Sequence, residues 1–209
     1  MTNKKKVLLL GDSIRLNAQP FVKTFLPKDF EVYGPQDNCE SSANLLQNLD
    51  RWMDPAVYFH TAHEQKLSWH VIHINAGLHD IRFNPGLEHP VATLKVYQKH
   101  LKSIFEKITL WRSKNLLLNS TKIIWASSTP FDELVHNREK PSKRYVEHLI
   151  TYNQSAINLA LEHKFLVNHL YEKLYQQDCS QLWLADGLHF NEKGNALVGR
   201  LIADAIISA

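Results

Sequence analysis

The feature that most constrains the fold of this chain is the alternation of short apolar runs with longer stretches of helical periodicity. The apolar runs occupy residues 7–10, 30–35, 69–77, 121–130 and 165–171. Short runs of this kind are typical of strands that are covered on both faces, as in parallel sheets. Stretches with apolar residues at helical spacing follow them, at about residues 17–26, 41–53, 90–112, 142–164 and 191–208. The sequence therefore predicts an α/β fold in which helices cover both faces of a parallel sheet.

Proline and asparagine residues indicate where some of these helices begin. Pro20 is poorly tolerated inside a helix but fits a first turn, so the first helix is expected to begin between Asn17 and Gln19. Pro90 is expected in the first turn of the third helix for the same reason. Asn191 is the predicted N-cap of the last helix, because its side chain can accept a hydrogen bond from a backbone N–H that the helix leaves unpaired.

The length of the chain limits the number of domains. A chain of 209 residues fits one α/β domain or a tight pair of small domains. Hydrophobic residues make up 44% and charged residues 22% of the chain, which is an ordinary globular composition. Because the sequence contains neither a linker nor a repeat of solenoid period, we expect a single domain over residues 1–209.

Charge and cysteine content narrow the partners and the compartment. The formal net charge is +3, and the one tight basic run, Lys4–Lys6, is interpreted as a solvated terminus rather than a nucleic-acid patch. The only cysteines, Cys39 and Cys179, indicate no disulfide framework and fit a reducing compartment. The apolar stretches are too short for a signal peptide or a membrane span. We therefore expect a cytoplasmic protein with no nucleic-acid partner.

Polar clusters are expected to meet at one edge of the predicted sheet. Three of them, at residues 11–13, 75–80 and 129–132, each follow a predicted strand. A fourth, at residues 186–189, precedes the last helix and can return to the same edge. Ligands of open parallel sheets bind at the carboxyl ends of the strands. These clusters are therefore the candidate functional residues.

The first and last clusters contain the groups needed for nucleophilic catalysis. The hydroxyl of Ser13 becomes a good nucleophile only when a base removes its proton. In "DGLHF", His189 is a candidate base, and Asp186 is three residues away and able to orient the imidazole. A helix cap or a packed histidine would explain each residue separately. The combination favours a catalytic set.

The same blocks resemble those of the SGNH (GDSL-type) hydrolases. "GDSI", "NAGLHD" and "DGLHF" occur in the order of that family and span Gly11 to about Gly194. The resemblance implies a flavodoxin-like three-layer α/β/α sandwich with a mostly five-stranded parallel sheet. It implies that Ser13 is the nucleophile, His189 the base and Asp186 the orienting acid. It also implies a small-molecule or carbohydrate acyl ester as substrate. Independently of the resemblance, motifs and their spacing predict no cofactor and no metal.

Two positions depart from the pattern of the family, and both concern the oxyanion hole. Cys39 stands where the family has a glycine whose backbone N–H donates to the oxyanion, and His79 stands at the position of an asparagine. We expect the N–H groups of Ser13 and Cys39 and the side chain of His79 to form the hole. Asn75 and Asn38 are alternative donors.

Charged residues near the blocks are candidate substrate contacts. Arg15 follows the nucleophile by two residues and either binds an acidic group of the substrate or forms a salt bridge at the rim; Arg82 has the same two interpretations. Asn75 and Asp80 are further candidate contacts, and Asp80 is able to orient His79. Asp12 is expected to organise the turn rather than to take part in the chemistry.

The remaining segments give weaker signals. "HTAHE", at residues 60–64, does not have the spacing of a zinc site. The surrounding segment, Trp52–Trp69, is expected either to form a lid or acyl-group wall beside Ser13 or to fill the edge of the core. Residues 127–133 are interpreted as a surface turn. No dinucleotide or Walker motif is present, so no phosphate cofactor is predicted.

The combined prediction is a serine ester hydrolase that acts on an acyl or O-acetyl group through an acyl-enzyme intermediate. An O-acyltransferase would use the same residues, and only the acceptor would differ. A protein of another class, a catalytically silent ligand-binding module of the same fold, would also explain the altered oxyanion positions. No feature of the sequence predicts an oligomeric state.

Overall fold

The protein contains a five-stranded sheet in which all strands are parallel. The computed structural model describes residues 4–59, 69–114, 120–177 and 179–209; the predictions for residues 60–68 lie outside this part of the chain. The strand order is β2-β1-β3-β4-β5. The strands are β1 (Lys5–Leu10), β2 (Phe30–Tyr33), β3 (Val71–Ile74), β4 (Lys122–Ala126) and β5 (Leu166–Asn168). The predicted flavodoxin-like parallel sheet is confirmed.

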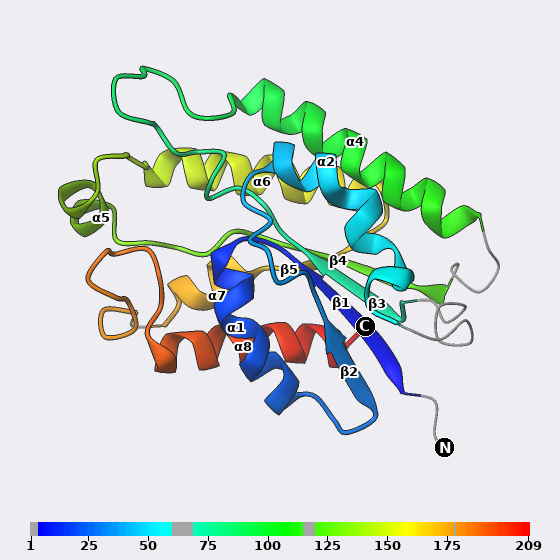
Figure 1. Ribbon diagram of the computed structural model, residues 1–209. Helices are drawn as coiled ribbons and strands as arrows, with labels where there is room; N and C mark the ends of the chain where they lie inside the picture. Colours follow the sequence, from blue (N-terminus) through cyan, green and yellow to red (C-terminus); the bar gives the residue numbers. More distant parts are fainter. Residues whose placement is uncertain (1–3, 60–68, 115–119, 178) are drawn as a thin grey trace.

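Helices cover both faces of this sheet (Figure 1). One layer consists of α1 (Ser13–Phe25), α7 (Leu170–Tyr175) and α8 (Glu192–Ile207). The other consists of α2 (Ser42–Met53), α4 (Leu94–Ser113) and α6 (Val146–Glu162). A short helix, α5 (Glu133–Glu139), lies beyond the sheet, and a 3₁₀ turn follows α2 at Pro55–Val57. The architecture is therefore the predicted three-layer sandwich.

Burial explains why the strands are short and continuously apolar. The side chains of Val7, Leu8, Leu9 and Leu10 are all fully buried, because helices cover both faces of β1. In the register of the sheet, Leu10 lies opposite Ile74 of β3. The turn that follows β1 is therefore beside the connection that follows β3, as the polar clusters predict.

The first helix begins earlier than the sequence predicts. It starts at Ser13, not between Asn17 and Gln19, and it contains Pro20 in its interior. Asp12 caps the helix, since its Oδ1 accepts a hydrogen bond from the N–H of Ile14 at 3.0 Å. Pro20 lies on the exposed side of the helix. The stabilisation from the cap and from burying one side of the helix is thus larger than the cost of the hydrogen bond that proline cannot donate.

Two further predictions about helices are wrong. The helix α4 begins after Thr93, whose side chain caps it, and Pro90 instead pairs with Phe83 in an isolated bridge. The segment 127–133 is not a surface turn, because Ser127, Ser128 and Phe131 are buried; the helix α5 begins at its last residue, Glu133. Asp132 caps that helix by accepting from the N–H of Val135 at 2.9 Å.

Of the segment Trp52–Trp69, the structure describes residues 52–59 and Trp69, and the aromatic residues among them pack in the core. Phe59 packs its ring edge against Tyr33, with 4.9 Å between the centroids, and lies 5.5 Å from the ring of Trp69. Phe59 and Trp69 are buried. These contacts fit the prediction that the segment fills the edge of the core beside β2, and they concern only its described residues.

The last features of the fold are the state of the cysteines and the length and polarity of the helices. Cys39 and Cys179 are both buried, and neither forms a disulfide. Each described helix is too short or too polar to span a membrane.

Helix α8 packs closely on helix α1 and brings the two ends of the chain together (Figure 1). The contact depends on Gly199. A Cβ atom at this position would lie 2.5 Å from the Cβ of Phe21 and 3.1 Å from the carbonyl oxygen of Ala18. Because α8 starts only three residues after His189, this packing fixes the position of the loop at residues 186–189 relative to Ser13.

The substitution Gly199→Val tests this contact. We expect it to lower the free energy of unfolding by about 1–3 kcal/mol, because the added atoms overlap backbone and Cβ atoms that cannot move freely. Urea unfolding followed by tryptophan fluorescence measures the loss. The control is Asp204→Val at an exposed position of the same helix, where little change is expected because valine and aspartate have similar helix propensities. Equal losses in both variants would contradict the close packing.

Candidate active site

Ser13, His189 and Asp186 form a continuous hydrogen-bonded chain at the carboxyl edge of the sheet. The Oγ of Ser13 lies 2.9 Å from Nε2 of His189, and Nδ1 of His189 lies 2.7 Å from Oδ2 of Asp186. A carboxylate only accepts hydrogen bonds, so Nδ1 carries the proton. Nε2 is then free to accept the hydroxyl proton of Ser13.

The loop before α8 holds Asp186 in its ionised form. Its Oδ1 accepts hydrogen bonds from the N–H groups of Leu188 at 3.0 Å and His189 at 2.9 Å. Gly187 has φ +66°, a conformation that favours glycine and allows this tight turn. Burial acts to raise the pKa of Asp186, but the hydrogen bonds from the His189 ring and from the two amides outweigh it and lower the pKa to about 2.

A second chain of hydrogen bonds supports this loop from the side of α5. Nη1 of Arg144 lies 2.7 Å from Nε2 of His136, and Nδ1 of His136 lies 3.1 Å from the carbonyl oxygen of Asp186. Arginine only donates, so His136 accepts at Nε2 and donates from Nδ1. The N–H of Asp132 also donates to the carbonyl oxygen of Gly187 at 2.7 Å. The loop at residues 186–189 is thus attached to α5.

A pocket of about 250 Å³ opens beside the triad. Ser13 and His189 line it together with Asn38, residues of the segment 78–82 after β3, and residues of the segment 136–144 around α5. In Figure 1 these connections all extend beyond the carboxyl ends of the strands. The pocket is therefore the place where a substrate group can reach the hydroxyl of Ser13.

The expected oxyanion donors differ in their placement. The N–H of Ser13 lies in the first turn of α1, where backbone N–H groups have no partner within the helix. The N–H of Cys39 instead donates to the carbonyl oxygen of Gly11 at 3.1 Å, so it is already used within the protein. Asn38 lines the pocket, and its Oδ1 accepts from the N–H of Glu40 at 2.8 Å, which leaves its side-chain NH₂ as a donor.

His79 lines the pocket and is neutral at pH 7. Burial, followed by the charges of Arg144 and Arg82, lowers the pKa of His79 to about 4. A neutral imidazole offers one N–H as a donor, which is the capacity that the asparagine amide of the family pattern provides at this position.

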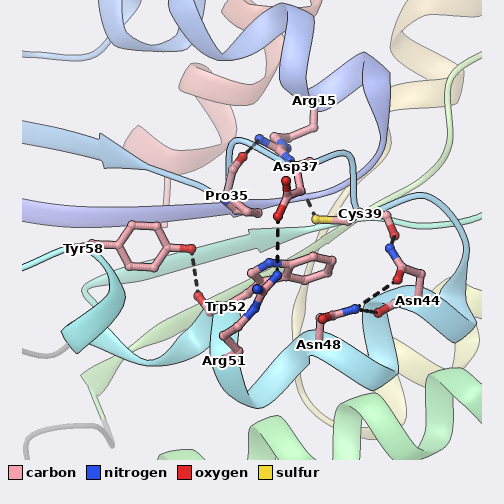
Figure 2. Close-up of polar contacts among 9 residues, drawn as sticks. All are labelled: Arg15, Pro35, Asp37, Cys39, Asn44, Asn48, Arg51, Trp52 and Tyr58. Carbon is pink, nitrogen blue, oxygen red and sulfur yellow. Dashed lines mark hydrogen bonds and ion pairs between the residues drawn. The ribbon is translucent and has the colours of Figure 1, made fainter.

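Arg15 is a buried structural residue rather than a substrate contact (Figure 2). Its side chain is 2% exposed. Nη1 donates to the carbonyl oxygen of Pro35 at 2.9 Å, and Nη2 donates to that of Asp37 at 2.8 Å. Nη2 also lies 3.7 Å from the Sγ of Cys39. The guanidinium therefore ties α1 to the connection between β2 and α2, and it forms no salt bridge with any residue that the structure describes.

Two more of the predicted substrate contacts, Asp80 and Asn75, also lie in the scaffold. The buried carboxylate of Asp80 accepts hydrogen bonds from the N–H of Ser42 at 3.0 and 3.1 Å and from its Oγ at 2.5 Å, at the start of α2. Burial raises the pKa of Asp80 to about 6 although these bonds act to lower it. Asn75 lies against Gly11, where a Cβ would come within 2.0 Å of the Asn75 Oδ1. The described residues that line the pocket do not include Arg15, Asn75 or Asp80.

Sequence reasoning missed the lining residues contributed by the segment around α5. His136, Lys140 and Arg144 all line the pocket, and the sequence analysis gave none of them a role. The signal available in the sequence was the local concentration of basic residues in "REKPSKR", residues 138–144, directly after a strand-end cluster. Among the described residues, no group of three or more His, Cys, Asp or Glu side chains could hold a metal ion.

Comparisons with known proteins agree with this architecture. No protein-family model matches the sequence, and no curated protein is similar to it. The lipase/acylhydrolase from Enterococcus faecalis has a similar structure, with a TM-score of 0.69 and 18% identity, over 98% of this chain and 96% of that chain. A member of the lipolytic protein G-D-S-L family from Veillonella parvula is also similar, with a TM-score of 0.62 and 18% identity, over 98% of this chain and 97% of that chain.

The acetyl xylan esterase AlAXEase is a third similar structure, with a TM-score of 0.61 and 16% identity, over 97% of this chain and 98% of that chain. A SGNH hydrolase from Slackia heliotrinireducens is also among the similar structures, with a TM-score of 0.61 and 13% identity, over 98% of this chain and 100% of that chain. The chain therefore has the SGNH hydrolase fold that its sequence blocks predict.

The substitution His136→Phe tests the support of the loop at residues 186–189. It removes both hydrogen bonds of the ring and keeps an aromatic side chain, so we expect Asp186 and His189 to lose alignment with Ser13. The rate at which a fluorophosphonate labels Ser13, followed by mass spectrometry, should fall by about 10- to 100-fold. His148→Phe, in an aromatic cluster outside the pocket, is the matched control. Wild-type labelling rates in His136→Phe would refute the role of this chain of bonds.

Proposed function

We propose that the protein is a serine ester hydrolase that acts through an acyl-enzyme intermediate. The observation that carries the proposal is the aligned contact between the Oγ of Ser13, the ring of His189 and the carboxylate of Asp186, at the edge of an open pocket. The similar structures include lipases and an acetyl xylan esterase, which supports ester chemistry on this fold.

In the first half of the reaction, the Oγ of Ser13 attacks the ester carbonyl while Nε2 of His189 accepts the hydroxyl proton. The carbon–oxygen bond to the alcohol breaks, and the protonated His189 donates the proton to the departing oxygen. Asp186 remains ionised and stabilises the imidazolium through the 2.7 Å contact. In the second half, water replaces the alcohol, His189 accepts a proton from it, and the acid leaves as Ser13 recovers its proton.

The negative charge that develops on the carbonyl oxygen needs fixed donors. The N–H of Ser13 and the neutral side chain of His79 are the proposed donors, and the amide of Asn38 is a third candidate from the lining. Donors of this kind act strongly because they are already oriented before the reaction starts.

Variants of the triad test the nucleophile. We expect Ser13→Ala to abolish labelling by a fluorophosphonate and to reduce hydrolysis of p-nitrophenyl acetate by roughly 10³-fold or more. Asp186→Asn should reduce hydrolysis by roughly 10²–10⁴-fold, because it no longer selects the reactive tautomer of His189. Ser155→Ala, on α6 and outside the pocket, is the matched control. Undiminished hydrolysis in Ser13→Ala, or no labelling of the wild type, would contradict the proposal.

Variants of His79 test the oxyanion hole. His79→Ala should lower kcat by about 10²–10³-fold, whereas His79→Asn should retain most of the activity because its amide replaces the lost donor. Since the pKa of His79 is about 4, the imidazole stays neutral above that value. The ratio of wild-type to His79→Asn activity should therefore be constant between pH 6 and 9. A kcat of His79→Ala equal to that of the wild type would exclude His79 as a donor.

A further inference from the structure

The pocket beside Ser13 carries an excess of positive charge. Arg82, Lys140 and Arg144 line it, and Asp186 is the one carboxylate among its described lining residues. Asp186 is already bonded to the ring and the N–H of His189, and Lys140 lies 3.8 Å from its Oδ2. The two arginines are therefore not neutralised by a carboxylate within the lining.

Arg82 differs from the other arginines near the site because its side chain has no hydrogen-bond or ion-pair partner in the described part of the chain. Its Nε atom is buried without a hydrogen bond, and no hydrogen bond or ion pair of its guanidinium is found among the described residues. By contrast, Arg144 donates from Nε to the carbonyl oxygen of Leu78 at 2.7 Å and from Nη1 to His136. A buried donor without a partner is rare in folded proteins and calls for a ligand or water to satisfy it.

The backbone around Arg82 is fixed. The N–H of Val91 donates to the carbonyl oxygen of Arg82 at 2.8 Å. The next residue, Phe83, exchanges two backbone hydrogen bonds with Lys143, at 2.8 and 3.0 Å. The side chain of Arg82 therefore extends from a braced connection that also carries His79.

We infer that this pocket binds an anionic group of the ester substrate, a carboxylate or a phosphate close to the scissile bond, and that Arg82 is its main ligand. The planar guanidinium matches the two oxygens of such a group, and Lys140 and Arg144 add charge at the same place. A volume of about 250 Å³ suits a small anionic substituent. The inference rests on the proposed function and adds the class of substrate.

The test compares anionic esters with neutral esters of matched length. Ethyl hydrogen glutarate against ethyl valerate places the charge on the acyl side, and 4-acetoxybenzoate against methyl 4-acetoxybenzoate places it on the alcohol side. In at least one pair, the wild-type protein should have a kcat/KM for the anionic ester roughly 10- to 100-fold higher. A ratio near one or below in both pairs would overturn the inference and leave the proposed function intact.

Variants assign the preference to Arg82. In Arg82→Gln the ratio of anionic to neutral kcat/KM should fall to near one, and in Arg82→Lys it should lie between that value and the wild-type ratio, because the charge remains but the paired donors are lost. Arg138→Gln, whose guanidinium is exposed on α5 and paired with Glu139, is the matched control and should keep the wild-type ratio. A wild-type ratio in Arg82→Gln would overturn the assignment.

A binding measurement separates this inference from the proposed chemistry. Calorimetric titration of Ser13→Ala with inorganic phosphate at constant ionic strength should give binding that Arg82→Gln in the same background weakens about tenfold or more. If the wild-type protein hydrolyses no ester and phosphate binding still depends on Arg82, the anion site remains and the proposed reaction is excluded. Absence of phosphate binding together with no preference for anionic esters would remove the anion site alone.

Discussion

The packing of α8 on α1 through Gly199 is the contact on which the geometry of the site depends. The hydroxyl of Ser13 and the ring of His189 are separated by 176 positions in the chain and lie 2.9 Å apart in the structure. Both residues stand at the starts of these two helices or just before them. Close contact between the helices at Gly199 fixes their relative position, and the chemical groups at their ends meet as a consequence.

A second set of contacts, made by α5 and Arg144, holds the loop at residues 186–189 in place beside Ser13. The helix α5 holds the loop at residues 186–189 through His136 and through the backbone contact from Asp132 to Gly187. Arg144 links the same region to the segment after β3 by its bond to the carbonyl oxygen of Leu78. Ser13, His189 and the pocket wall thus belong to one connected polar network. Displacement of one connection would therefore disturb all three.

The sequence predicted the sheet and the meeting of Ser13, His189 and Asp186 at its edge because both predictions depend on local signals. Short apolar runs and helical spacing identified the strands and most helices, and the side chains at the strand ends identified Ser13. The start of α1 was predicted wrongly because the rule for Pro20 is local, whereas the cap at Asp12 and the burial of the helix against the sheet and α8 decided the outcome. Arg15 was misplaced for the same reason, since its partners at Pro35 and Asp37 are distant in the chain.

The sequence by itself therefore determined the layer architecture and the order of the elements, and it singled out Ser13, His189 and Asp186, which the fold brings into hydrogen-bond contact. Periodicity and residue chemistry are properties of short segments, and these features follow from them. Only the tertiary structure decided which charged residues face the pocket: Arg15 and Asp80 are buried in the scaffold, whereas Arg82, Lys140 and Arg144 line the cavity. The physical reason is that the direction and burial of a long charged side chain are set by packing between segments distant in the chain.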